Sequence, residues 1–387
     1  MEEWKEYKLA DVCSRLRSGK GIKSDSVLDS GPYPVIGGNG IRGYANESNF
    51  KGECAVIGRQ GAYCGNVRFY EGEAYMTEHA VVVVGNELAD TRFLACLLSL
   101  MHLGNLSAQS AQPGISVQTL SKQIVSLPSI DYQKRVSAVI KSLDDKIEVN
   151  RRINENLEQQ AQALFKSWFV DFEPFKDQPF VESELGMIPQ GWRVGTLDEI
   201  GDVIGGSTPS KARPEYYTEN GIAWLTPKDL SLSNAKFTAK GEIDITQEGY
   251  NSCSTKLMPK GTVLFSSRAP IGYITIAKND ICTNQGFKSV VPGYAGTAFI
   301  YCYLKVATPD IENKATGSTF KEASGSLMKS LQLVIAPKDI MDSFEERMKP
   351  IFAEQECVED ESRRLAELRD TLLPRLMSGE LKVTCTE

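Results

Sequence analysis

Two stretches of the chain place apolar residues at the alternating three- and four-residue spacing of a heptad seam. The first runs from Val136 to Trp168 and the second from Phe344 to Leu376. Each exceeds thirty residues, which corresponds to roughly 50 Å of α-helix at about 1.5 Å per residue. We therefore expect two long helices that pair as an antiparallel coiled coil within one molecule. The expected core positions are Val136, Ile140, Leu143, Ile147, Leu157, Leu164, Phe344, Met348, Ile351, Val358, Leu365 and Leu372.

Polar residues interrupt both seams near their middles, at Asn150 and Asn154 in the first and at Gln355 and Ser362 in the second. Such residues can fix the register of paired helices at a cost in stability. The second seam continues past its middle with a slip in phase that brings in Leu368. Two unrelated, solvent-facing helices are the alternative to a pair.

Pro374 lies in the last part of the second seam. A proline inside a helix removes a backbone donor and clashes with the preceding turn. We expect the second helix to kink or end there, a feature with no counterpart in the first helix.

The rest of the chain has short β-rich runs bounded by Gly, Pro or Asn, which is typical of strands and turns. The sequence therefore predicts an α+β fold with two mixed α/β domains in a pseudo-twofold repeat, separated by the pair of long helices. Strands are expected at residues 54–57, 81–84, 263–265 and 273–277, and short helices at 94–103 and 298–305.

An internal repeat supports two similar halves. Residues 4–12, WKEYKLADV, resemble residues 192–200, WRVGTLDEI, and residues 50–59, FKGECAVIGR, resemble residues 259–268, PKGTVLFSSR. The second comparison aligns Arg59 with Arg268. The chain thus has the order globule, helix, globule, helix.

The domain boundaries follow from the repeat and from three prolines that predict a stiff connector between the halves. We expect a first globular domain at 1–128, a first helix at 129–172, a Pro-rich linker at 173–191, a second globular domain at 192–337, a second helix at 338–378 and a tail at 379–387.

Composition narrows the class of protein. The 387 residues are 41% hydrophobic and 24% charged, as in ordinary globular proteins. The start of the chain lacks the pattern of a secretory signal, and no apolar run reaches the length of a membrane span, so we expect a cytoplasmic protein without a membrane. Nine cysteines without a C-x-x-C pair and only two histidines predict no metal site.

Charge is uneven along the chain. The net charge is −7, and residues 126–184 and 337–387 together carry −8, so the acidic excess lies on the two expected helices. No dinucleotide fingerprint, P-loop, nucleophile elbow or methyltransferase motif is present, and residues 309–314, PDIENK, crowd their carboxylates too closely in sequence for a nuclease site. We expect no catalysis and no bound cofactor.

The arrangement resembles the DNA-specificity subunit of type I restriction-modification enzymes. The resemblance covers nearly the whole chain and is most specific around the helices. Residues 127–136, LPSIDYQKRV, look like the family's entry into the first helix, and residues 164–175, LFKSWFVDFEPF, look like its exit. Residues 188–192, IPQGW, resemble the start of the second recognition domain, and residues 368–383, LRDTLLPRLMSGELKV, resemble the C-terminal end.

The resemblance implies a non-catalytic subunit whose two target-recognition domains each read half of a bipartite site in double-stranded DNA. The helices would act as a ruler and dock two methyltransferase subunits, and restriction/translocase subunits would join the complex. S-adenosylmethionine, ATP and Mg would then be bound by those partners. Two alternatives stay open: a coiled-coil protein-interaction scaffold without DNA readout, and a degenerate enzyme.

Candidate DNA contacts are polar residues in expected loops, where amide and guanidinium groups can meet base edges or phosphates. Each can equally be a solvated loop residue or a turn former, and the recurrence of arginine favours Arg59 and Arg268. The candidates are Asn39, Arg42, Tyr44, Arg59, Gln60 and Tyr63 in the first half, and Thr226, Lys228, Asp229, Ser267, Arg268, Asn284, Gln285, Lys288, Ser318, Thr319 and Lys321 in the second.

Overall fold

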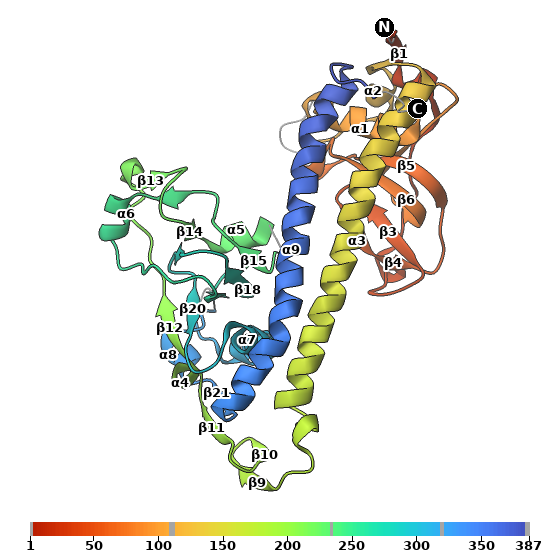
Figure 1. Cartoon of the computed structure of the whole chain (residues 1–387). Coiled ribbons are helices and arrows are strands. Elements are labelled where there is room, and N and C mark those ends of the chain that lie inside the picture. The colour runs from red at the N-terminus through yellow and green to blue at the C-terminus, as the bar shows by residue number, and fades with distance from the viewer. Residues whose placement is uncertain (1–2, 108–112, 233–234, 318–320, 384–387) are drawn as a thin grey trace. The chain divides into compact units, whose positions relative to one another are not determined.

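A computed structural model describes residues 3–107, 113–232, 235–317 and 321–383 (Figure 1). The chain divides into two compact units. Unit 1 comprises Met1–Ile147 and Arg364–Glu387, and unit 2 comprises Glu148–Arg363. Each long helix therefore contributes one part to each unit.

Unit 1 is built on a six-stranded sheet with the order β2-β7-β5-β6-β3-β4. Neighbouring strands are antiparallel except β3 and β6, which are parallel. Helix α1, Thr91–Leu100, buries Phe93, Leu94 and Leu98 in the same core as Ala55 and Ile57 of the sheet. The strands are β2 (Cys13–Ser18), β3 (Tyr33–Gly37), β4 (Gly40–Ala45), β5 (Phe50–Gly58), β6 (Val67–Met76) and β7 (Ala80–Gly85).

The two ends of the first globular domain meet in a separate strand pair. Strand β1, Lys5–Lys8, is antiparallel to β8, Ile124–Leu127. Helix α2, Val117–Ser121, precedes β8, and its N-cap Ser116 accepts a hydrogen bond from the amide of Thr119. The chain then enters the first long helix.

Unit 2 repeats this order of elements. Strand β11 (Arg193–Thr196) is antiparallel to β21 (Gln332–Ile335), and the main sheet has the order β12-β20-β17-β18-β15. That sheet comprises β12 (Gly201–Gly205), β20 (Lys288–Pro292), β17 (Val263–Ser267), β18 (Ile271–Ala277) and β15 (Phe237–Thr238). Smaller elements are α4 (Leu197–Ile200), β13 (Tyr217–Thr218), β14 (Trp224–Leu225), α5 (Pro227–Leu232), β16 (Asp244–Ile245), α6 (Gln247–Asn251), β19 (Cys282–Thr283), α7 (Thr297–Lys314) and α8 (Gly325–Lys329).

Backbone hydrogen bonds align the two units with an offset that differs by one residue from the sequence comparison. Ile115 donates its amide to the carbonyl of Arg59, and Ala323 donates likewise to Ser267. Arg59 therefore corresponds to Ser267, and the predicted equivalence of Arg59 and Arg268 is wrong. Strand β17 has a shift of register between Phe265 and Ser267 in its pairing with β18, whereas β5 pairs with β6 without one.

The two long helices are α3, Ile130–Phe169, and α9, Lys338–Met377, each of 40 residues. Within unit 2 they are antiparallel neighbours, because Asn150 donates to Glu361 at 2.8 Å and the rings of Phe165 and Phe344 lie 6.2 Å apart. Within unit 1 Arg369 donates to Asp144 at 2.9 Å. The helices are thus packed against each other in both units, and the alternative of two solvent-facing helices is excluded.

The twelve expected core positions of the helix pair are all buried or half-buried. Leu368, by contrast, is 47% exposed, so the expected continuation of the seam through it is wrong. Half-buried Arg369 lies between the half-buried Leu365 and Leu372 instead. The heptad spacing therefore continues through Arg369 without a slip, and a polar residue occupies that seam position.

Proline does not interrupt α9. The helix continues past Pro374 to Met377, and it also contains Pro350. Of the two outcomes expected at Pro374, a kink or an end of the helix, the end is wrong. Burial of Leu376 and Met377 against the unit 1 core explains the last turn, since packing can offset the roughly 3 kcal/mol that an internal proline costs.

The segment between the two halves is folded, although a stiff connector was expected. It contains a 3-10 turn (Glu173–Phe175) and a hairpin of β9 (Phe180–Ser183) and β10 (Gly186–Pro189). The rings of Phe172 and Phe175 lie 5.5 and 4.9 Å from that of Trp192. This aromatic contact joins the segment to the core of unit 2.

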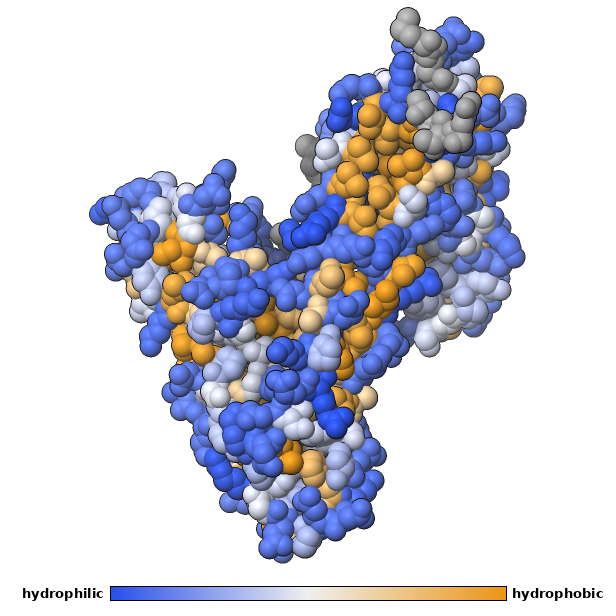
Figure 2. Space-filling view, viewed as in Figure 1, coloured by the Kyte–Doolittle hydropathy of each residue, from blue (hydrophilic) through white to orange (hydrophobic). Residues whose placement is uncertain are grey.

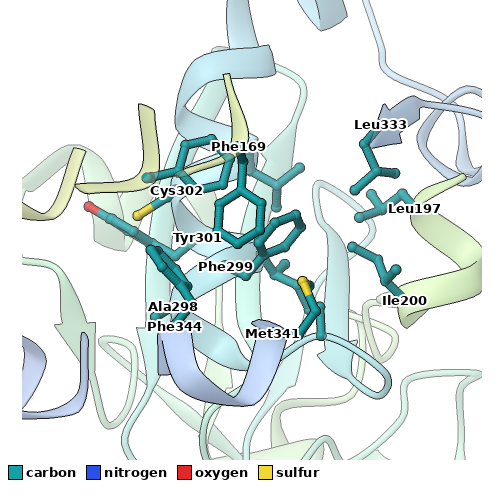
Figure 3. Packing of buried hydrophobic residues seen from close by; sticks show 14 of the residues in the cluster. Phe169, Leu197, Ile200, Ala298, Phe299, Tyr301, Cys302, Leu333, Met341 and Phe344 are labelled. Atoms are coloured by element: carbon teal, nitrogen blue, oxygen red, sulfur yellow. The ribbon is translucent and has the colours of Figure 1, made fainter. Parts of the chain in front are cut away.

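The core of unit 2 is rich in aromatic residues from α3, α7 and α9. The ring of Phe169 lies 4.8 Å from that of Phe299 and 4.9 Å from that of Phe344, both nearly perpendicular to it (Figure 3). Edge-to-face pairs of this kind add roughly 0.5–1.5 kcal/mol each beyond buried area. The core therefore attaches one end of each long helix to the second globular domain.

The visible surface is largely hydrophilic, with hydrophobic residues in separate patches (Figure 2). Within the described ranges, no helix is long and apolar enough to cross a membrane.

Candidate nucleic-acid interface

Six of the predicted DNA contacts line one cleft in unit 2, with a volume of about 810 Å³. They come from three segments, each of which follows a strand: β14, β17 and β19. The six residues are Thr226, Lys228, Asp229, Arg268, Asn284 and Gln285. Sequence reasoning missed the other walls of this unit 2 cleft, which include Thr208, Lys211, Tyr217, Trp224 and Ile243.

The segment after β14 forms the first turn of α5 (Pro227–Leu232), where a loop was expected. Asp229 accepts hydrogen bonds from the amide and hydroxyl of Thr226, both at 2.7 Å, and from the amide of Glu242 at 2.9 Å. Both of its carboxylate oxygens are therefore engaged in holding the local backbone. Asp229 has a structural role in this arrangement.

Lys228 forms an exposed ion pair with Glu242, with Nζ 2.9 Å from Oε2. The hydrogen bond that Lys228 donates to Glu242 raises the pKa of Lys228. The ammonium group stays charged at neutral pH, but part of its charge is balanced locally.

The segment after β19 contributes two amides. Asn284 accepts a hydrogen bond from the amide of Gly286 at 2.8 Å through Oδ1, and Gln285 accepts one from the hydroxyl of Thr208 through Oε1. This bond fixes the orientation of the Asn284 side-chain amide, because a backbone N–H can only donate and must therefore face the side-chain oxygen. The amino groups of both side chains have no hydrogen-bond acceptor among the residues that the structure describes.

Arg268 lies next to a carboxylate that is already bonded. Its Nη1 is 3.7 Å from Oε2 of Glu322, beyond hydrogen-bond distance, while Lys288 donates to Oε1 of Glu322 at 3.2 Å. The Arg268 side chain is 36% exposed and that of Lys288 is 17% exposed. Arg268 thus retains its hydrogen-bond donors, whereas Lys288 is mostly committed to Glu322.

Among the described residues, the candidates Ser267, Lys288 and Lys321 do not line the unit 2 cleft. Ser267 is fully buried and donates to the carbonyl of Gly286, so it cannot reach DNA and leaves the candidate set. Lys321 donates to the carbonyl of Glu312 at 3.3 Å. Ser318 and Thr319 lie outside the described residues.

Strand β4 and the turn before it carry the first group of candidates in unit 1. Asn39 lies in the turn between β3 and β4, but Arg42 and Tyr44 lie on β4 itself, which corrects the expected loop. Glycines at 40 and 43 adopt φ of 111° and 147°, so a glycine-rich sequence there forms a distorted hairpin. Arg68 of β6 donates to the backbone and side-chain oxygens of Asn39 at 2.6 and 3.1 Å.

The second group in unit 1 follows β5. The backbone of Arg59 is bonded to His79 and Ile115, and its side chain is half-buried. Gln60 is exposed, and Tyr63 is 50% exposed within a 3-10 turn. Their exposure leaves both available to a partner molecule.

The structure defines a protein with two α+β binding domains, each continued by a long helix, and with a polar cleft built from loops at strand ends in the second domain. The chain belongs to the type I restriction-modification specificity-subunit family. It matches the family described as "Type I restriction modification DNA specificity domain" at residues 1–159 and again at 189–354. Members of this family are non-catalytic subunits, and the predicted family and α+β fold are confirmed.

Individual relatives agree with this assignment. Over 157 residues the chain is 41% identical to the type I restriction enzyme MjaIX specificity subunit of Methanocaldococcus jannaschii, covering 40% of this chain and 36% of that protein. Over 330 residues it is 28% identical to the HindI specificity subunit of Haemophilus influenzae, covering 70% and 71%. The chain thus matches about a third of the first relative and just over two thirds of the second.

A solved structure shows the same fold. The crystal structure of the type I restriction-modification system S subunit from M. genitalium matches with a TM-score of 0.64 at 16% sequence identity, covering 100% of this chain and 97% of that one.

Proposed function

We propose that the chain is the sequence-specific DNA-binding subunit of a type I restriction-modification system and reads a bipartite target with its two globular domains. The observation that carries this proposal is the presence of two specificity domains in one chain, at 1–159 and 189–354. A single chain with two such domains is suited to two half-sites joined by a fixed gap.

The partners follow from this role. Two methyltransferase subunits and the restriction/translocase subunits supply the chemistry, and they bind S-adenosylmethionine, ATP and Mg. The long helices set the gap between half-sites and hold the methyltransferase subunits. The assembly works in the cytoplasm, where its DNA lies.

The proposed DNA contacts in unit 2 are the candidates with free hydrogen-bond donors: Arg268, Asn284 and Gln285, with Lys228 near phosphates. Those in unit 1 are Asn39, Arg42, Tyr44, Gln60 and Tyr63, with Arg59 beside them. Base-edge contacts from amides and guanidinium groups provide sequence discrimination, while lysine contacts position the duplex.

A coiled-coil scaffold without DNA readout is the competing function, and a footprinting experiment separates the two. The chain is purified with its methyltransferase subunits and tested on DNA that carries the motif methylated in the host genome. The specificity role predicts two protected half-sites with an unprotected gap. A stable complex that protects no defined sequence would favour the scaffold.

A further inference from the structure

Four side chains that line the unit 2 cleft carry hydrogen-bond donors that the protein does not use. Arg268 offers guanidinium N–H groups, Asn284 and Gln285 offer amino groups, and Lys211 offers an exposed ammonium group. None of these groups donates a hydrogen bond within the described part of the chain. Four separate donors therefore remain available to a molecule in the cleft.

The side-chain oxygens nearest to these donors are engaged within the protein. Asp229 uses both carboxylate oxygens for the amides of Thr226 and Glu242, and Glu242 is paired with Lys228. The side-chain oxygens of Asn284 and Gln285 are bonded to Gly286 and Thr208. An incoming group with its own donors would therefore find the side-chain oxygens of Asp229, Asn284 and Gln285 already bonded within the protein.

Base edges in the major groove differ in this respect. Guanine presents two acceptors side by side, O6 and N7, whereas adenine and cytosine each present an amino group and thymine presents one acceptor beside a methyl group. A group of free donors such as Arg268, Asn284 and Gln285 pairs fully with guanine. It leaves an amino group unpaired against adenine or cytosine, which costs binding energy.

We propose that the unit 2 cleft selects guanine in the half-site read by the second domain, with Arg268 and Gln285 as specificity-determining residues. This inference rests on the proposed DNA-binding function and adds the class of base that is read. Arg268 is suited to the O6 and N7 pair, because its guanidinium group can donate two parallel hydrogen bonds.

The test uses the complex of the full chain with its methyltransferase subunits and DNA duplexes carrying the host methylation motif. Each guanine of both half-sites is replaced in turn by 7-deazaguanine, which lacks the N7 acceptor, or by inosine, which keeps the major-groove edge. We expect at least one guanine at which 7-deazaguanine weakens binding about 5- to 100-fold and inosine does not.

Two conservative variants connect that guanine to the cleft. Arg268→Lys keeps the positive charge but loses the bidentate donor, and Gln285→Glu replaces the donor by an acceptor at constant size. We expect one or both to reduce the 7-deazaguanine effect at that guanine to about twofold or less, while binding to the other half-site stays unchanged. Gln285→Glu should also accept cytosine or adenine there.

Lys329→Ala provides a matched control, because Lys329 pairs with Asp198 at 3.1 Å in the same unit but does not line the cleft. It should keep the wild-type response to every probe. Thermal melting of each variant verifies folding, and both test variants preserve side-chain size closely enough to fold.

The outcomes separate this inference from the proposed function. If wild-type complex binds its motif no better than scrambled DNA, the proposed function fails. If it binds specifically but both variants respond to 7-deazaguanine like wild type at every guanine, the DNA-binding role stands and guanine selection by the cleft is overturned.

Discussion

Lys236 of unit 2 is a buried charge in contact with both long helices, and its replacement tests how the second domain is attached to them. Its side chain is 6% exposed, and Nζ lies 2.8 Å from Oε2 of Glu158 on α3 and 2.7 Å from Oε1 of Gln355 on α9. The ring centroids of Phe352 and Tyr301 lie 3.6 and 4.2 Å from Nζ. The substitution Lys236→Met keeps most of the apolar stem and removes the charge together with these two hydrogen bonds.

The expected loss of folding stability depends on how well Glu158 remains bonded after the substitution. Removal of one partner from a buried ion pair costs about 3–5 kcal/mol, because the other charge stays desolvated. Glu158 keeps hydrogen bonds from Gln162 at 3.1 Å and Gln355 at 3.4 Å, and its side chain is 26% exposed. These contacts place the expected loss for Lys236→Met near the lower end, at about 3 kcal/mol.

A double-mutant cycle isolates the pair. Burial raises the pKa of Glu158, but the charge and hydrogen bond of Lys236 outweigh it and hold this pKa below its ordinary value. The carboxylate therefore stabilises the fold above its unfolded pKa and loses this contribution as the pH falls through the lowered value. We expect Glu158→Gln and Lys236→Met to couple by about 2 kcal/mol at neutral pH, and less in acid.

Urea unfolding followed by tryptophan fluorescence measures these changes, since Trp168, Trp192 and Trp224 all lie in unit 2. The control is Lys314→Met, which breaks an exposed pair with Asp310 and should cost about 0.5 kcal/mol or less. Equal unfolding midpoints for Lys236→Met and Lys314→Met would refute the assignment of a stabilising buried charge.

Three further results are expected. Burial raises the pKa of Glu345, although two amides of α7 donate hydrogen bonds to its carboxylate. The folded state therefore binds a proton more readily than the unfolded state, and stability rises as the pH falls from above the folded-state pKa toward the unfolded-state pKa. Glu345→Gln should abolish that rise in urea midpoints. Matched insertions of about four residues near Asn150 and near Val358 should lengthen the helix pair by roughly 6 Å. The gap between the two half-sites of the methylation motif should then grow by one or two base pairs. An unchanged gap in an active variant would show that the helices do not set the distance between the half-sites. The isolated chain should bind S-adenosylmethionine no better than an unrelated protein, and a micromolar site in calorimetry would contradict this.

The long helices were the most predictable part of the fold. A seam that is buried on one side imposes a spacing of three and four residues along many turns, so α3 and α9 begin and end within three residues of the expected bounds. Pro350 and Pro374 show where local rules fail. Burial of neighbours such as Met348 and Leu376 outweighs the local preference against proline.

The sequence predicted several residues that line the cleft, but not the hydrogen bonds that they make. Loop position and side-chain chemistry selected Arg268, Asn284 and Gln285, but neither predicts which oxygens are already bonded. Ser267 was misplaced because a one-residue irregularity in β17 turns its side chain into the core. The sequence did not predict the buried contacts of Lys236, because its partners lie 78 and 119 residues away along the chain.

The strand pairs that close the two globular domains have a consequence for how such a chain changes over generations. Lys5 lies opposite Leu127, and Arg193 lies opposite Ile335, so each domain starts and finishes at one place. A segment whose ends are adjacent can be exchanged for another of different length while the flanking helix keeps its starting point. Recombination near residues 192 and 337 would then replace the sequence that the second domain reads and leave both long helices intact.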